Sequence, residues 1–176
     1  MKSRTLEREE LDLLWSIDRS ERVDRVYRFE NGRLVLVPER HDTRGWPPGE
    51  PERDGALIRD CFDHGGTVYG VFEGATLVGA AVLESRFIGR AGDQLQLKFL
   101  HVGRRHRGAG VGHMLFDQVV ARARELGARK LYVSATPSEN TIRFYLGRGC
   151  RVAEEVDAAL FALEPEDIHL EYEIPR

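Results

Sequence analysis

Residues 93–112 read D-Q-L-Q-L-K-F-L-H-V-G-R-R-H-R-G-A-G-V-G, the most informative stretch of the chain. Its first part, Asp93–Val102, predicts a β-strand. Up to residue 99 the strand has a polar face of Gln94, Gln96 and Lys98 and an apolar face of Leu95, Leu97 and Phe99. A loop rich in glycine and arginine follows this strand.

The segment after the loop has the clearest helical pattern in the chain. Val111, Leu115, Val119 and Ala123 recur every four residues, and Gly127 stands where a helix would end. The N-terminus of a helix presents unpaired N–H groups and a partial positive charge, and glycine lets the backbone approach an anion closely. A strand, a glycine loop and a helix in this order therefore predict a phosphate-binding site. A tight structural turn is the alternative.

Two common nucleotide-binding motifs do not fit this loop. A Rossmann fingerprint starting at Gly108 needs glycine where the chain has His113, and an acid about 20 residues on, where it has Tyr132–Ser134. A P-loop starting at Gly103 needs a lysine after its second glycine, but Ala109 follows Gly108. If the loop binds phosphate, it therefore does so through a motif other than the Rossmann fingerprint or the P-loop.

The stretch Leu97–Cys150 resembles the core of the GNAT superfamily of acyl-CoA-dependent N-acyltransferases. Arg107–Gly112 (R-G-A-G-V-G) matches the family pattern Q/R-x-x-G-x-G/A, and Phe99–Val102 resembles the family's splayed strand. Asn140–Cys150 is similar to the family element N-x-x-x-x-Y-x-x-x-G-F/C. The resemblance implies one α/β domain over residues 1–176 with a central mixed, mostly antiparallel twisted sheet, a splayed strand and flanking helices.

The resemblance also implies a binding site for acetyl-CoA as co-substrate. In the family the backbone of the splayed strand binds the pantetheine arm, a role that falls here on Leu100, His101 and Val102. The pyrophosphate is held by the glycine loop, which here comprises Arg107, Gly108, Ala109, Gly110, Val111 and Gly112. Asn140 would bind the pantetheine or the neighbouring chain, with a helix N-cap as its alternative role.

Tyr145 matches the family tyrosine that lies near the thioester sulfur. A tyrosine has a pKa of about 10 and a thiol one of about 8.5, so complete proton donation to the thiolate costs about 2 kcal/mol. We therefore expect Tyr145 to stabilise the departing thiolate by a hydrogen bond. A core aromatic is the alternative role.

The general base is less clearly marked. Many relatives carry a carboxylate on the splayed strand at the position of Gln96, and an amide is not a useful proton acceptor. Glu84, at the end of the neighbouring predicted strand, is the predicted substitute. His101, Asp93 acting through water, or the absence of a dedicated base are the alternatives.

The rest of the chain fits the same single domain. An amphipathic helix is predicted near residues 7–19, a hairpin around Asn31-Gly32, a loop over His41–Pro51 and a short helix over Ala56–His64. Further strands are predicted over Thr67–Phe72, Thr76–Glu84, Lys130–Ala135, Val152–Val156 and His169–Ile174. Thr136-Pro137-Ser138-Glu139 predicts a capping box, with proline in the first helical position, that opens a helix reaching Leu146.

Charge is unevenly distributed along the chain. The net charge of −3 argues weakly against a general nucleic-acid-binding protein. Residues 98–130 carry eight basic and two acidic side chains, whereas residues 150–176 carry two basic and eight acidic ones. This distribution suits an anionic cofactor and a cationic substrate, with ordinary solvated charge as the alternative.

The remaining features narrow the class of protein. Cys61 and Cys150 are too few and too far apart for a disulfide framework, and the histidines lack ligand spacing, so no metal is expected. Neither a signal peptide nor an apolar run of the roughly 20 residues that cross a bilayer is found, which predicts a cytoplasmic protein without a membrane partner. A homodimer is left open.

These observations predict an enzyme that moves an acetyl group from acetyl-CoA directly to a primary amine. The alternative is a CoA-binding regulatory domain without catalytic activity, which Gln96 would support. The amine could belong to a polyamine, an antibiotic, an amino acid or a protein. Trp46 and the acids Asp42, Glu50 and Glu52 are predicted to line the acceptor cleft, with an ordinary surface loop as the alternative.

Overall fold

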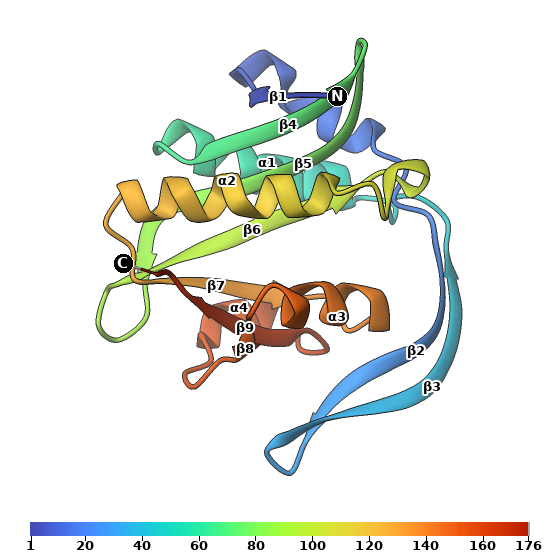
Figure 1. The fold of residues 1–176 in the computed structure, drawn as a ribbon, viewed down its shortest axis with the longest axis vertical. Coiled ribbons are helices and arrows are strands. Elements are labelled where there is room, and N and C mark those ends of the chain that lie inside the picture. The colour runs from blue at the N-terminus through green and yellow to red at the C-terminus, as the bar shows by residue number, and fades with distance from the viewer. Residues whose placement is uncertain (176) are drawn as a thin grey trace.

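The computed structural model describes residues 1–175, which are arranged around a seven-stranded sheet (Figure 1). In spatial order the strands are β1 (Lys2–Thr5), β4 (Thr67–Glu73), β5 (Thr76–Ile88), β6 (Gln94–Val102), β7 (Lys130–Ala135), β9 (Ile168–Glu173) and β8 (Arg151–Val152). Neighbouring strands are antiparallel except β6 and β7, which are parallel. The expected mixed, mostly antiparallel sheet is therefore confirmed.

Helices cover both faces of the sheet. One face carries α2 (Val111–Glu125) and α3 (Glu139–Gly147), whose apolar side chains form one core with β5, β6, β7 and β9. The other face carries the 3-10 helix η1 (Arg8–Ser16) and α1 (Glu50–Asp63), which bury a second, smaller core. The short α4 (Ala158–Leu163) lies against the same face, where Phe161 packs on His169 of β9.

A long two-stranded hairpin extends from the body of the molecule (Figure 1). It consists of β2 (Glu21–Glu30) and β3 (Arg33–Thr43), joined at Asn31-Gly32, where both residues have positive φ. Beyond the middle of β2, on the way to the turn, the backbone N–H of Tyr27 donates to the carbonyl of Pro137 at 2.8 Å. The hairpin thereby contacts the segment that leads into α3.

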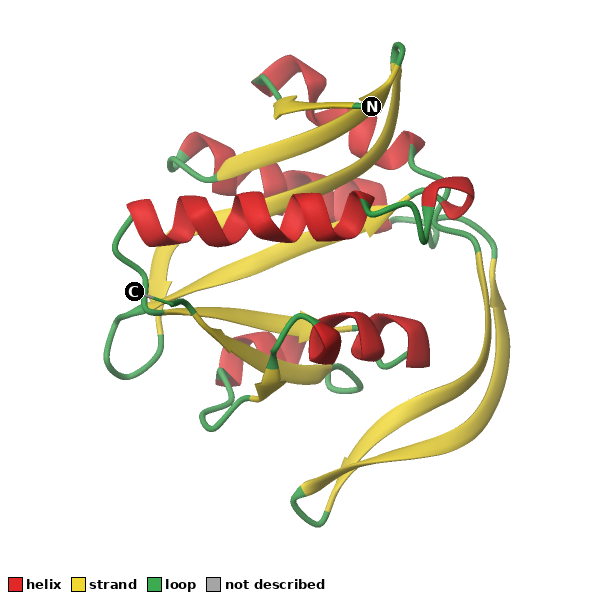
Figure 2. Cartoon of the chain, in the orientation of Figure 1, coloured by secondary structure: helices red, strands yellow, loops and turns green. Residues whose placement is uncertain are grey.

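The sheet opens between β6 and β7. The two strands pair only where Gln94–Gln96 face Lys130–Tyr132, and beyond this point they diverge (Figure 2). Strand β6 stays paired with β5 along its remaining length, up to Val102 opposite Gly79. The splayed strand predicted from the sequence is thus present, and its open edge faces the end of β7.

A bulge in β6 reverses which residues point to which face. Val82 of β5 lies opposite Phe99, but the next residue, Leu83, lies opposite Leu97, which leaves Lys98 as an extra residue. One inserted residue moves every later side chain to the other face of a sheet. Phe99 therefore belongs to the core beside η1 and α1, and the prediction that it shares a face with Leu97 is wrong.

Several predicted elements have different limits in the structure. Strand β1 and helix α4 were not predicted, β3 extends to Thr43, and α1 begins at Glu50, which leaves only residues 44–49 as a loop. The N-cap of α3 is Ser138, whose side chain accepts a hydrogen bond from the N–H of Thr141. The predicted capping box starting at Thr136 is wrong, because an antiparallel bridge between Ser138 and Val26 keeps the chain extended up to this point.

Candidate active site at the open edge of the sheet

The open edge of β6 offers backbone groups to an extended ligand. Within residues 1–175, β6 has no pairing with β7 beyond Gln96, so Leu100, His101 and Val102 have a strand neighbour only on the β5 side. An extended amide-containing chain can occupy such an edge as an added strand would. These three predicted pantetheine-binding residues are therefore brought together at one edge.

The glycine loop lies at the end of β6 and leads into α2. Gly108 and Gly110 have φ values of 76° and 82°, in the left-handed region that favours glycine. A β-carbon at either position would have no neighbour within 4 Å, so both glycines face open space in front of the helix N-terminus. An anion could approach this loop closely, as the sequence predicts.

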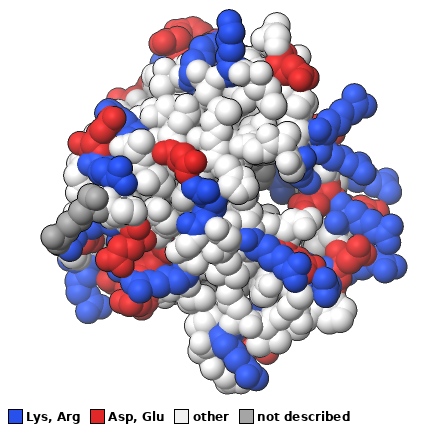
Figure 3. Space-filling view, viewed as in Figure 1, with Lys and Arg blue, Asp and Glu red and all other residues white. Residues whose placement is uncertain are grey.

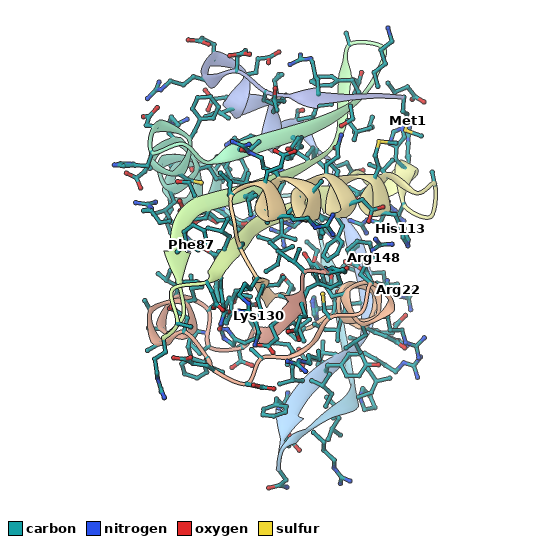
Figure 4. All side chains as sticks on the ribbon, turned by 60° about the vertical axis from the view of Figure 1, so that its left-hand side comes forward. Met1, Arg22, Phe87, His113, Lys130 and Arg148 are labelled. Atoms are coloured by element: carbon teal, nitrogen blue, oxygen red, sulfur yellow. The ribbon has the colours of Figure 1, made fainter. Side chains whose placement is uncertain are left out.

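Gly112 has a different reason to be glycine. A β-carbon there would lie 3.1 Å from the Phe144 ring of α3, which is tighter than an ordinary contact. Arg148, beyond α3, also reaches α2: it lies over the Phe116 ring at 5.2 Å and pairs with Asp117 (Figure 4). Gly112 thus lets α2 and α3 pack closely, whereas the two earlier glycines shape the loop.

Arg107 and Asn140 are both held by the start of the hairpin. The guanidinium of Arg107 donates to the carbonyls of Val102 at 3.2 Å and Arg19 at 3.1 Å, and lies 3.8 Å from Glu21. The amide of Asn140 donates to the other carboxylate oxygen of Glu21 at 2.8 Å. Asn140 is not the helix cap, since Ser138 takes that position, so its amide lies free of the helix and close to the loop.

Basic side chains gather around this end of the molecule. In the view of Figure 3 they crowd the side that carries the loop before α2 and the base of the hairpin, with acidic side chains among them. An open hollow of about 270 Å³ lies there, lined by Glu21, Arg22, Asp42, Arg44 and Arg104 together with Ser20 and Thr43. Asp42 therefore lies beside the glycine loop rather than over the middle of the sheet.

Tyr145 is buried on the α3 side of the opening. Only 5% of its surface is exposed, and its ring contacts Phe144 and Phe116 edge-on. Burial raises the pKa of Tyr145, and the nearby Cys150 and Asp167 raise it further. The phenol therefore keeps its proton at neutral pH, which makes complete transfer to a thiolate more costly than the sequence alone suggests.

His101 belongs to an aromatic cluster on the η1 and α1 face. Its ring lies 4.6 Å from Phe99 and 4.9 Å from Trp46, which itself stacks on Phe99. The indole N–H of Trp46 donates to the carbonyl of Ile17 at 3.1 Å, which fixes the loop before α1 over the open strand. Burial, followed by the charges of Arg19 and Arg107, lowers the pKa of His101 to about 3, so the imidazole is neutral.

Glu84 lies within β5, which continues to Ile88, and its carboxylate is already engaged in ion pairs. It is 5% exposed, and its oxygens lie 2.8 Å from Arg86 and 3.6 Å from Lys98. Burial alone would raise the pKa of Glu84, but hydrogen bonds from Arg86 and the backbone N–H of Ser85, with the charge of Lys98, lower it to about 2. A carboxylate held in this way is a weak proton acceptor, which argues against the predicted role as general base.

A pair of residues beside the opening was not predicted from the sequence, Ser134 near the end of β7 and Asp167 just before β9. Ser134 donates a hydrogen bond of 2.9 Å to Asp167, the residue before β9. Burial raises the pKa of Asp167 to about 6, although the bond from Ser134 opposes this shift. The signal for Asp167 is weak, because this residue stands in an acidic segment that resembles ordinary surface charge.

The other residues predicted to line the acceptor cleft do not all lie at the opening. Glu50 pairs with Arg19 at 2.9 Å, next to Trp46, whose ring lies under the same guanidinium. Glu52 is exposed on α1.

Among residues 1–175 there is no cluster of three or more potential metal ligands. In the same part of the chain, no helix is long and apolar enough to cross a membrane.

A sheet that opens beside a glycine-rich helix N-terminus defines a class of protein that can hold an extended, phosphate-bearing ligand between two strands. Comparison with known families specifies the class further. The chain belongs to the acetyltransferase (GNAT) family, whose model matches residues 32–149. A search of curated proteins gave no match.

Solved structures share the fold over nearly the full length. Nourseothricin acetyltransferase is 22% identical with a TM-score of 0.73, and the match covers 99% of this chain and 98% of that one. A protein described as a streptothricin acetyltransferase, from Bacillus anthracis str. Ames in complex with acetyl coenzyme A, is 15% identical with a TM-score of 0.75 over 99% and 98% of the chains. PaiA N-acetyltransferase from Thermoplasma acidophilum, in complex with coenzyme A, is 16% identical with a TM-score of 0.64 over 98% of both. At these identities the likeness shows the fold.

Proposed function

We propose that the protein transfers the acetyl group of acetyl-CoA to a primary amine. The observation that carries this proposal is the unpaired edge of β6, which ends at a glycine loop facing open space. An arm inserted along Leu100–Val102 would bring its phosphates to Arg107–Gly112. Two of the structures with this fold contain acetyl-CoA or CoA, which supports the same ligand here.

The residues of the opening can serve the chemistry of acyl transfer. A backbone N–H on the open edge of β6 can donate to the thioester carbonyl and stabilise the negative charge that develops there. Tyr145, which keeps its proton, can donate a hydrogen bond to the departing thiolate. The stack of Trp46 on Phe99, with His101 beside it, gives the open strand an aromatic wall on the η1 and α1 face.

A panel of amines tests this proposal. The protein is incubated with acetyl-CoA and, separately, a polyamine, a streptothricin, an aminoglycoside, an amino acid and a peptide, and the release of free thiol is measured. We expect release that depends on one class of amine and product that carries one added acetyl group per amine. Binding of CoA without turnover on any member of the panel would instead indicate the regulatory domain.

A further inference from the structure

Asp167 stands at the wall of the opening in the sheet. It directly precedes β9, whose first residue, Ile168, lies opposite Ala135 at the end of β7. This part of β7 has lost its pairing with β6 and forms one side of the opening. The bond from Ser134 to Asp167 therefore holds a carboxylate at the edge where an inserted ligand would end.

The face on which this carboxylate lies can be read from the strand. Val133 and Ala135 belong to the core beneath α2 and α3, so Ser134, between them, points to the opposite face. That is the face on which β6 places Phe99 and His101. A second substrate approaching from this face would meet the carboxylate of Asp167 before it reached the open edge.

The charges around Asp167 leave it free to act. Within residues 1–175 it forms no ion pair, in contrast to Glu84 with its two cations. Its titratable neighbours are Glu164, from the turn after α4, and Tyr145 of α3. Glu164 is partly balanced by Arg53 of α1, at 3.6 Å.

We infer that Asp167 is the general base that takes the proton from the acceptor ammonium. This inference rests on the proposed function. The ammonium gives one proton to the Asp167 carboxylate, and the neutral nitrogen then forms a C–N bond with the acetyl carbon while the C–S bond breaks. The thiolate leaves with the electron pair and takes up the second proton of the nitrogen, and Asp167 returns its proton to water.

The pKa values of the three candidate bases support this assignment. A base works best when its pKa is near the working pH, since it must be both ionised and able to hold a proton. The pKa of Asp167, about 6, meets this condition, whereas that of Glu84, about 2, and that of His101, about 3, do not.

The test is the pH dependence of kcat/KM with the best amine of the panel. We expect the wild-type rate to fall below about pH 6 as Asp167 takes up a proton. Asp167→Asn keeps the shape and can accept the bond from Ser134, and it should lose about a hundredfold or more at pH 7. Near the pKa of the amine, about 10, the substrate arrives deprotonated and the two proteins should converge.

The acid limb of the profile is the pH range in which kcat/KM falls as Asp167 takes up a proton. Two neighbouring substitutions should move this limb in opposite directions. Ser134→Ala removes a bond that lowers the pKa of Asp167, so the limb should move to higher pH. Glu164→Gln removes a negative charge that raises it, so the limb should move to lower pH. Glu166→Gln, at an exposed acid in the same turn, is the matched control and should leave the limb in place. A structural role cannot produce this pair of shifts.

The possible failures can be told apart. A wild-type protein that transfers acetyl groups, but whose acid limb is unmoved in Asp167→Asn, Ser134→Ala and Glu164→Gln, would overturn the role of Asp167 alone. Absence of transfer to every amine would overturn the proposed function and the base with it. CoA binding and the melting temperature of each variant, unchanged from wild type, show that the site is intact. If Asp167→Asn does not fold, the opposite shifts in the other two variants decide the question.

Discussion

Replacing Glu84 by glutamine should destabilise the protein in a pH-dependent way. Its pKa falls from 4.5 to about 2 in the folded state, and each pKa unit corresponds to about 1.4 kcal/mol. The charge of Glu84 therefore stabilises the fold by about 3 kcal/mol at neutral pH. Glutamine keeps the shape and can still accept the N–H of Ser85, but it leaves Lys98 without this ion pair and Arg86 paired with Asp60 alone.

The sign of the pH dependence follows from the depressed pKa. The stabilisation is fully present above pH 4.5, the value of the unfolded chain, and is lost as the pH falls toward 2. Urea unfolding of wild type and Glu84→Gln should therefore differ by about 3 kcal/mol at pH 7, and by progressively less below pH 4.5. Glu52→Gln, at an exposed acid on α1, serves as the control.

Two results would refute this reasoning. Equal stability of the two proteins at pH 7 would mean that the ion pairs contribute nothing to the fold. An equal loss at every pH would mean that the shape of the site, rather than the charge of Glu84, is responsible. In either case the carboxylate would no longer be excluded as a base by its partners.

Three further predictions concern the cofactor site and the stability of the second carboxylate. Saturating CoA should raise the melting temperature, since a ligand at 100 times its Kd adds about 2.7 kcal/mol, and Gly110→Glu should abolish the shift. Gly127→Glu is the control, because Gly127 also has positive φ and open space but lies past the far end of α2. If CoA still raised the melting temperature of Gly110→Glu, the cofactor would bind elsewhere. Tyr145→Phe should lower kcat about tenfold to a thousandfold with CoA binding unchanged, as measured under single turnover, and an unchanged chemical rate would return Tyr145 to the core. Asp167→Asn should be at least as stable as wild type at pH 7. Folding raises the pKa of Asp167 from 3.8 to about 6, so ionisation of this carboxyl costs stability as the pH rises through that range. A variant that unfolds at lower urea than wild type would contradict the burial of that charge.

The parts of the fold that the sequence predicted well have local signals. The order of strand, glycine loop and helix from Gln94 to Glu125 follows from side-chain periodicity and from the glycines, and β7 was predicted with its observed limits. The extent of the hairpin was not predictable in this way. Residues 38–43 are mostly polar, and they form a strand because β2 pairs with them.

Features of the site that depend on a distant segment could not be predicted from the sequence. The extra residue at Lys98 is defined only by its pairing with β5, and nothing in the spacing of β6 reveals it. Glu84 was predicted as the base from its position in the strand before β6, but its ion pairs with Arg86 and with Lys98 of β6 form only in the folded chain. Asp167 reaches the opening only because β9 pairs with β7, and no motif in the sequence marks it.

The bulge at Lys98 makes this the position at which β6 can lose a residue without turning its other side chains to the opposite face. Substituting Lys98 by alanine would remove its contact with Glu84 and leave the register intact. Deleting it would place Phe99 directly after Leu97, and regular alternation would then keep Phe99 and His101 toward Trp46 and keep Leu100 and Val102 toward α2. In a library of single deletions, expression should therefore be higher for loss of Lys98 than for loss of Leu100 or His101, which would turn the residues that follow to the other face.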